Sequence, residues 1–293
     1  MNRIAVLICT AAIAIALGAW SMAGMRDSGS ASARGQFDRN LSRRIQDALL
    51  NWQSRVQDRF LGADWSIPRR YRSRLVAVRP PHYTDREIAL TFDDGPDPKT
   101  TTELLDFLKE KNIKVTFFVL GWRAKKHPEL IKRMLNEGHV VGNHTFLHPA
   151  RPDGIRAAKE FARTQEVIGR AIGRKPTVFR PPYGISSGQN AHYAKKAGLP
   201  VVNWTLSSAD TGTKSPAAVT LNILGGAKPG DIALFHDTGQ HTVTAIPRIV
   251  KALEKRGFRF VTVPEMLRNW NQHVSILAEE NKLRRAKAKK TNR

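Results

Sequence analysis

Residues 87–96 read EIALTFDDGP, a short apolar run followed by two adjacent carboxylates and a turn dipeptide. A run of this length bounded by a turn is typical of a buried strand, which we predict over Glu87–Phe92. Asp93 and Asp94 then stand at the carboxyl end of that strand. Gly95-Pro96 is ordinary turn chemistry, and a turn alone would account for one acid. Two adjacent acids repel each other unless they have different partners, so both are candidate functional residues.

From about residue 86 onward, short strands alternate with helices. The predicted strands are Glu87–Phe92, Val115–Leu120, His139–Gly142, Thr177–Arg180, Val201–Leu206, Asp231–His236 and Phe258–Val263. The helix-like stretches are Thr101–Lys111, Pro128–Glu137, Gly154–Ile172, Gln189–Ala197, Pro216–Leu224 and Val243–Arg256. Seven strands alternating with helices in about 180 residues imply an α/β fold with a parallel sheet, either closed as a barrel or open and doubly wound.

Polar residues follow five of these strands. They lie in the stretches 91–96, 143–149, 180–184, 207–210 and 234–237. In a parallel α/β fold the functional side chains gather at the carboxyl ends of the strands, which all lie on one side of the sheet. The sequence therefore predicts a single site built from several strand ends.

A metal site is the first candidate chemistry. His144 and His148 are four residues apart and would point the same way from a helical turn, so they can share a metal ion. A histidine pair at this spacing is a weak signal alone, but Asp94 from a neighbouring strand end would complete a set of two histidines and one carboxylate. Such a set leaves a coordination position open for water, as in catalytic zinc sites.

An acid and a base are the second candidate chemistry. Arg180 is available to pair with Asp93, which would keep that carboxylate ionised as a general base. His236 ends a strongly apolar strand and is a candidate general acid. Asp210 is its candidate partner, which would raise the pKa of the imidazole and orient the ring. The alternative is a hydrogen-bonded histidine that merely closes a strand.

With these residues placed, the chain resembles the polysaccharide deacetylase family, the NodB-like domains of carbohydrate esterase family 4. The resemblance covers about residues 85–270. It rests on four motifs in the family's order, TFDDGP at 91–96, HTxxHP at 144–149, RPPYG at 180–184 and LFH at 234–236. It implies a distorted (β/α)7 barrel that hydrolyses N-acetyl groups of N-acetylglucosamine-containing glycans in the cell envelope, such as peptidoglycan or a chitin-like polymer.

The resemblance also implies roles for individual residues. Asp93 would be the general base positioned by Arg180, and His236, tuned by Asp210, would protonate the leaving amine. Asp94, His144 and His148 would hold one divalent metal, with zinc as the default and cobalt, nickel or manganese also suited to these ligands. Substrate contacts would come from Pro181, Tyr183 and Leu234, with the Tyr183 backbone stabilising the oxyanion and Leu234 touching the acetyl methyl group.

One motif departs from the family pattern. After the fifth strand the family usually has Asp-x-x-Asp-Trp, whereas this chain has Ser207 in place of the first Asp and Thr211 in place of the Trp. The departure puts the usual sugar-chain preference in doubt. It leaves two further functions open, a non-catalytic envelope glycan-binding protein and a deacylase for another acyl group such as an O-acetyl ester or a formamide.

The N-terminus indicates export. Residues 4–25 contain no charged side chain and follow Arg3, which is typical of either a cleaved signal peptide or an uncleaved membrane anchor within residues 1–25. Residues 26–84 are predicted to hold a polar linker and an arginine-rich amphipathic helix whose apolar stripe runs from Phe37 to Phe60. Cys9 is the only cysteine and lies in the apolar segment, so the exported part has no disulfide and no thiolate site.

The net charge of +23 lies mostly in the two ends of the chain. Residues 1–80 hold 13 arginines, no lysine and five acids, and residues 281–293 hold seven basic residues and no acid. The tail 271–293 is expected to be disordered or frayed where it is most basic. For an exported protein such ends indicate attraction to anionic lipid or anionic wall polymer, not to nucleic acid, although a merely solubilising tail is the alternative.

Overall fold

The computed structural model describes residues 64–291, and their side chains as far as residue 285. The chain divides into two compact units, residues 1–49 and 50–293, and every described residue belongs to the second. The predicted export or anchor segment and the predicted helix between residues 37 and 60 lie outside the described residues. None of the described helices is both long and apolar enough to cross a bilayer.

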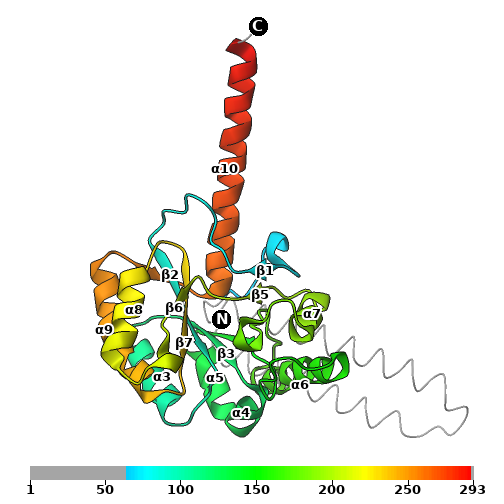
Figure 1. Ribbon diagram of the computed structural model, residues 1–293, viewed down its shortest axis with the longest axis vertical. Coiled ribbons are helices and arrows are strands. Elements are labelled where there is room, and N and C mark those ends of the chain that lie inside the picture. The colour runs from blue at the N-terminus through cyan, green and yellow to red at the C-terminus, as the bar shows by residue number, and fades with distance from the viewer. Residues whose placement is uncertain (1–63, 292–293) are drawn as a thin grey trace, which may run out of the picture. The chain divides into compact units, whose positions relative to one another are not determined.

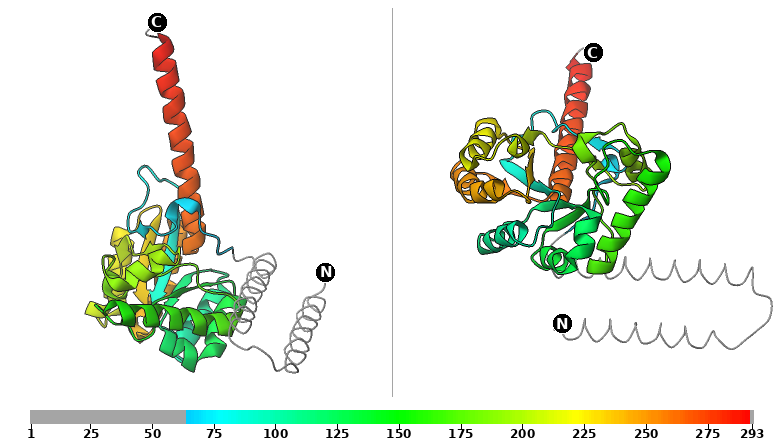
Figure 2. Two further views of the ribbon diagram at one scale, coloured as in Figure 1. Left: turned by 90° about the vertical axis from the view of Figure 1, so that its right-hand side faces the viewer. Right: turned by 60° about the horizontal axis from the view of Figure 1, so that its bottom comes forward.

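A parallel β-sheet forms the centre of the described unit (Figures 1 and 2). Its strands are β1 Leu75–Val76, β2 Glu87–Asp93, β3 Thr116–Val119, β4 Val140–Asn143, β5 Val201–Val202, β6 Leu206–Ser207, β7 Asp231–His236 and β8 Arg259–Phe260. The main ladder has the order β4-β3-β2-β7-β6, with β8 paired to the first residues of β2, and every pair is parallel. Burial on both faces explains why β2 is an almost unbroken apolar run.

The sheet is strongly curved. Phe179 bridges both Asn143 of β4 and Val201 of β5, which adds β5 and its partner β1 beyond β4. β5 therefore lies next to one end of the strand order and β6 at the other end, yet only residues 203–205 connect them. A connection this short spans at most about 14 Å, so the two ends of the sheet curl toward each other. The α/β class and parallel sheet are thus confirmed, whereas closure into a barrel is not.

Helices cover the outside of this sheet (Figure 1). They are α3 Thr100–Glu110, α4 Gly121–Lys126, α5 Pro128–Asn136, α6 Gly154–Ile172, α7 Gln189–Lys196, α8 Pro216–Gly226, α9 Gln240–Lys255 and α10 Val263–Thr291, with short 3₁₀ turns at Arg69–Tyr71, Pro182–Gly184 and Asp210–Gly212. α8 packs on α9 and α9 on α3, while α6 packs on α4, α5 and α7. Between helices and sheet lies one large apolar core around Phe92, Phe117 and Phe235.

Local chemistry explains several helix ends. Asp153 caps α6 by accepting a hydrogen bond from the Arg156 N–H, and Gly173 ends that helix with φ of +72°. Ser215 caps α8 in the same way, and Pro216 occupies its first position. These signals are why both helices begin where the sequence predicts.

Three sequence expectations are wrong in detail. The expected strand Val201–Leu206 is two strands, because the chain crosses between the two ends of the curved sheet within it. The expected strand at residues 177–180 is reduced to bridges at Phe179, because the flanking prolines at 176, 181 and 182 keep the hydrogen-bonded ladder from extending in either direction. The tail is not frayed as far as it is described, because α10 runs unbroken to Thr291.

Candidate active site

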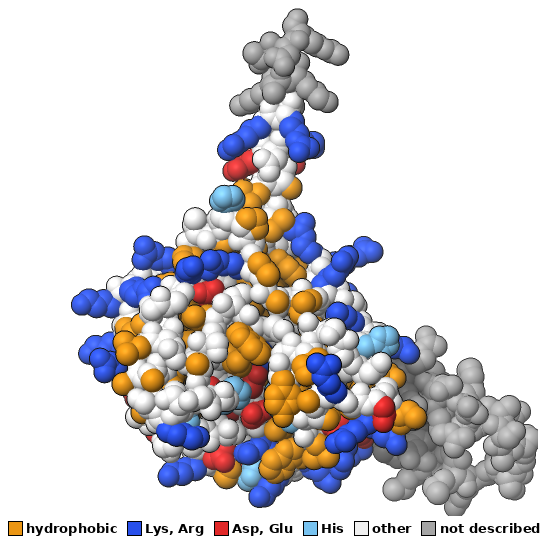
Figure 3. All heavy atoms as spheres, viewed as in Figure 1, with side chains coloured by type: hydrophobic (Ala, Val, Ile, Leu, Met, Phe, Trp, Pro, Cys, Tyr) orange, Lys and Arg blue, Asp and Glu red, His pale blue; other side chains and the backbone are white. Residues whose placement is uncertain are grey.

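The predicted site residues meet at the carboxyl ends of the strands. In the β2–β7 ladder Asp93 is the register partner of His236, which puts the candidate base beside the candidate acid. β4 ends at Asn143, directly before His144. In Figure 3, red and pale-blue side chains come together at the surface of the body among hydrophobic ones.

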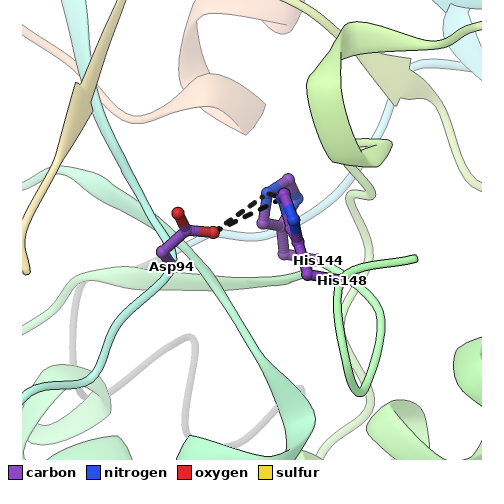
Figure 4. A group of neighbouring side chains, drawn as sticks. All are labelled: Asp94, His144 and His148. Atoms are coloured by element: carbon purple, nitrogen blue, oxygen red, sulfur yellow. Dashed lines mark hydrogen bonds and ion pairs between the residues drawn. The ribbon is translucent and has the colours of Figure 1, made fainter. Parts of the chain in front are cut away.

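Asp94, His144 and His148 converge on one point (Figure 4). Asp94 Oδ1 lies 3.5 Å from the Nε2 atoms of both histidines, and these two nitrogens are 3.2 Å apart. Within the described part of the chain, this is the cluster whose ligand atoms are close enough to share a metal ion. The expected helical turn is wrong, however, because residues 144–149 form a loop. Positive φ at Thr145 and His148 turns the second ring toward the first.

The polar atoms of this cluster fit a cation. His144 Nδ1 lies 2.8 Å from the Arg180 carbonyl oxygen, so Nδ1–H donates there and Nε2 is left with a free lone pair. Burial lowers the pKa of His144 to about 3, which keeps the ring neutral. Asp94 Oδ1 is buried and accepts no hydrogen bond. The free lone pair of His144, the nearby His148 ring nitrogen and the unpartnered carboxylate oxygen make a suitable set of ligands for a divalent metal.

Arg180 fixes Asp93 from below the site. It is fully buried and donates from Nη1 to Asp93 Oδ1 at 2.8 Å and to Thr91 Oγ1 at 2.7 Å. Its Nε and Nη2 donate to the carbonyls of Val202 and Asn203. Burial raises the pKa of Asp93 and the Arg180 charge opposes that rise. Asp93 Oδ2, on the other side of the carboxylate, lies 3.8 Å from the Nε2 atom of His144. The pair therefore presents a rigidly held carboxylate oxygen at the metal cluster.

His236 and Asp210 form a second hydrogen-bonded pair, next to Asp93 on the neighbouring strand. His236 Nδ1 and Asp210 Oδ1 are 2.8 Å apart, and Asp210 Oδ2 accepts hydrogen bonds from the His236 backbone N–H and from Thr242 Oγ1. Burial lowers the pKa of His236, but the bond to Asp210 and the charge of Asp93 outweigh it and raise that pKa to about 9. Burial raises the pKa of Asp210, but its hydrogen bonds from His236 and Thr242 and the charge of His236 outweigh burial and lower that pKa. The ring is thus held protonated near neutral pH, as a proton donor must be.

The three candidate substrate contacts lie close to this cluster. Pro181 directly precedes the 3₁₀ turn that follows Arg180, and Tyr183 lies inside this turn. Tyr183 is 66% exposed and has φ of +57°. Its ring centroid is 4.6 Å from that of His148. Leu234 precedes His236 by two residues on β7, so both side chains leave the same face of the strand.

Sequence reasoning gave no role to two residues at this site. Thr91 accepts the second hydrogen bond of Arg180 Nη1, and its position two residues before Asp93 on one strand could have indicated this. Asp237 is fully buried, and burial raises its pKa to about 7. An acid placed directly after His236 at a strand end was the available signal for it.

Comparison with known proteins identifies the family. The pattern of the polysaccharide deacetylase family matches residues 81–202. A peptidoglycan-N-acetylglucosamine deacetylase of Bacillus cereus is 40% identical over 63% of this chain and 69% of its own length. One from Listeria monocytogenes, PgdA, is 37% identical over 69% of this chain, but the match spans 43% of that longer protein.

A solved structure supports the same relationship. A peptidoglycan N-acetylglucosamine deacetylase in complex with 4-naphthalen-1-yl-N-oxidanyl-benzamide superposes with a TM-score of 0.62 and 37% identity, over 67% of this chain and 92% of that one. The match to the family pattern ends at residue 202, before Asp210 and His236. The fold nevertheless places these two residues next to Asp93, which lies within the matched range. The chain belongs to the polysaccharide deacetylase family.

Proposed function

We propose that this protein removes acetyl groups from N-acetylglucosamine units of a cell-envelope glycan, with peptidoglycan as its substrate. The observation that carries the proposal is the arrangement of three groups: the cluster of Asp94, His144 and His148, the Asp93–Arg180 pair on one side and the His236–Asp210 pair on the other. Relatives named as peptidoglycan deacetylases support the choice of substrate.

Asp94, His144 and His148 would hold one divalent metal, for which zinc is the default choice. When bound, such an ion polarises an amide carbonyl and lowers the pKa of water. The related structure contains an N-hydroxybenzamide, a hydroxamic acid of the kind that chelates divalent metals, and this also supports a metal.

The side chains around the cluster divide the proton transfers between them. Asp93, held by Arg180 and made more basic by burial, accepts a proton from the water that attacks the acetyl carbonyl carbon. The Tyr183 backbone N–H would donate to the oxygen that gains negative charge. When the carbon–nitrogen bond breaks, protonated His236 delivers its proton to the departing amine. The hydroxyl of water ends on the carbonyl carbon, and the proton that Asp93 takes up replaces the one that His236 gives to the nitrogen. The products are a free glucosamine amine and acetic acid, which ionises to acetate.

We also propose that the protein acts outside the cytoplasm. The uncharged segment of residues 4–25 supports export, with or without anchoring, and the basic ends support attachment to anionic lipid or wall polymer. The basic end of α10 is exposed through residue 285, as such a contact requires.

Acetate release from defined glycans tests the proposal. Purified protein should release acetate from peptidoglycan, and Asp93→Asn should reduce the rate by about 10²–10⁴-fold, because an amide cannot accept the proton. Asp85→Asn, a change of the same kind at an exposed acid, should have no effect.

Other outcomes would identify the alternatives. Acetate from an O-acetylated glycan or formate from a formamide, with none from N-acetylated peptidoglycan or chitooligosaccharide, would replace the substrate assignment. No product from any of them by metal-loaded protein would end the proposal of an enzyme.

A further inference from the structure

Asp237 is a fully buried carboxylate that has no part in the proposed reaction. It follows His236 at the end of β7, and its Oδ2 accepts a hydrogen bond from Thr101 Oγ1 in the first turn of α3. Its Oδ1 has no hydrogen-bond partner among the described residues. Burying a carboxylate with incomplete hydrogen bonding costs free energy, so its presence calls for a physical reason.

The carboxylate of Asp237 lies against the turn that carries Asp94. A Cβ added to Gly95 would lie 2.7 Å from Asp237 Cγ and closer still to both oxygens, so the glycine backbone packs directly on the carboxyl group. Thr101 Oγ1 also accepts a hydrogen bond from the Asp97 backbone N–H at 2.8 Å. Asp237 therefore contacts the turn at Gly95 and is linked through Thr101 to its far end.

β3 holds the turn through its backbone. The Asp94 N–H donates to the Phe118 carbonyl at 3.2 Å, and the Leu120 N–H donates to the Gly95 carbonyl at 3.0 Å. Between these contacts Asp94 has φ of +74°, a conformation that strains a non-glycine residue and persists only where the surroundings enforce it. Asp237 and Thr101 supply side-chain contacts that enforce it.

We propose that Asp237 is a positioning residue for the metal site: by packing under Gly95 and holding Thr101, it fixes the turn that aims Asp94 at His144 and His148. This inference rests on the proposed function, since it takes Asp94 to be a metal ligand. Asp237 would act by packing against Gly95 and by accepting the hydrogen bond from Thr101. An asparagine of equal size should therefore preserve the metal site, and an alanine should not.

Zinc affinity tests this role without reference to catalysis. The dissociation constant for Zn²⁺ is measured by competition with a chromophoric chelator on the whole protein. Asp237→Ala should weaken binding by about 10–100-fold, the usual effect of losing a group that orients a metal ligand. Asp237→Asn should stay within about threefold of the native protein, because it keeps the volume and the acceptor for Thr101.

Asp231→Ala is the matched control. Asp231 is a buried carboxylate at the amino end of the same strand, where it binds Arg79 and Thr205. Its loss should lower the thermal midpoint and leave zinc affinity unchanged. Should Asp237→Ala fail to fold, Thr101→Val removes the linking hydroxyl and should weaken zinc binding about tenfold, with Thr101→Ser restoring it.

The outcomes separate this inference from the function on which it rests. Native zinc affinity in folded Asp237→Ala or in Thr101→Val would overturn the positioning role alone. Equal weakening by Asp231→Ala, or a loss in Asp237→Asn as large as in the alanine variant, would overturn it as well. A native protein that binds no Zn²⁺ would overturn the metal site itself, and this inference with it.

Discussion

The buried acids at the two ends of the β2–β7 pair differ in their hydrogen bonding. At the amino end, Glu87 accepts hydrogen bonds on both oxygens, from Tyr83, Arg259 and Asn269. Asp231 likewise has partners for both oxygens. Every carboxylate oxygen of these two residues is satisfied within the protein, as is expected of groups that serve stability.

At the carboxyl end the same strands carry unsatisfied acids. Asp94 and Asp237 each leave a buried oxygen without a hydrogen bond. Five of the eight non-glycine residues with positive φ in the described part of the chain also lie at this end of the sheet: Asp94, Thr145, His148, Tyr183 and Ala209. Unpartnered atoms and strained backbone in one place indicate groups arranged for a ligand. Carboxylate oxygens without a hydrogen-bond partner, more than the presence of buried charge, therefore distinguish the functional end of the sheet from the structural end.

The largest effect is expected when one acid at each end of β2 is replaced. Asp94→Asn keeps a residue that tolerates positive φ but removes the charged ligand, so zinc binding and kcat/KM for acetate release should fall by about 10³-fold, the equivalent of several kcal/mol. Glu87→Gln should leave kcat/KM unchanged and lower the free energy of unfolding by about 1–3 kcal/mol, because Arg259 and Asn269 lose a charged acceptor. A large loss of rate in Glu87→Gln would break the contrast.

A smaller effect is expected at the His236–Asp210 pair. Only protonated His236 can donate, so the rate should fall as pH rises through its pKa, near 9 while Asp210 raises it. Asp210→Asn removes that support and should move the alkaline limb of the kcat/KM profile to lower pH. Above the new pKa each unit of lowering costs about tenfold in the protonated form. Zinc affinity, measured as the control, should not change; an unmoved alkaline limb would contradict the role of His236 as the acid.

Each sequence pattern predicts only the part of the structure that depends on local residues. Apolar runs that end in polar residues locate most of the strands and bring Asp93, Asp94 and His236 together, because parallel strands share a carboxyl edge. The spacing of His144 and His148 is the same in a helical turn and in a loop, so it cannot reveal positive φ at Thr145 and His148. The partnership of Asp237 with Gly95 depends on contacts between residues 142 positions apart, which no local pattern contains.

The basic end of the C-terminal helix differs from its expected disorder for another reason. Residues 281–291 lack an apolar stripe, which suggested disorder, yet they consist largely of lysine, arginine, alanine and leucine, which favour helix without any packing. Periodicity indicates which face of a helix is buried, and residues 281–285 are all exposed. Composition was the better signal there.

The smallest predicted effect concerns the strained backbone itself. Ala209 is exposed with φ of +53°, directly before Asp210. A left-handed conformation costs alanine about 1–2 kcal/mol, and the greater chain entropy of an unfolded glycine offsets about 0.5–1 kcal/mol of any relief. Ala209→Gly should therefore raise the free energy of unfolding by about 0.5–1 kcal/mol in urea titrations. Ala162→Gly, at an exposed position inside α6, should lower it by a similar amount.

The changes in the free energy of unfolding caused by Ala209→Gly and Ala162→Gly show whether the backbone at the carboxyl end of the sheet is strained. If Ala209→Gly destabilises as Ala162→Gly does, the backbone at this end is relaxed and unpartnered polar atoms alone distinguish it from the amino end. If it stabilises while kcat/KM falls by less than about threefold, the positive φ is a cost that the fold tolerates to place Asp210 against His236. The strain of positive φ at Asp94 and His148 could not be relieved by glycine in the same way, because the site needs both side chains.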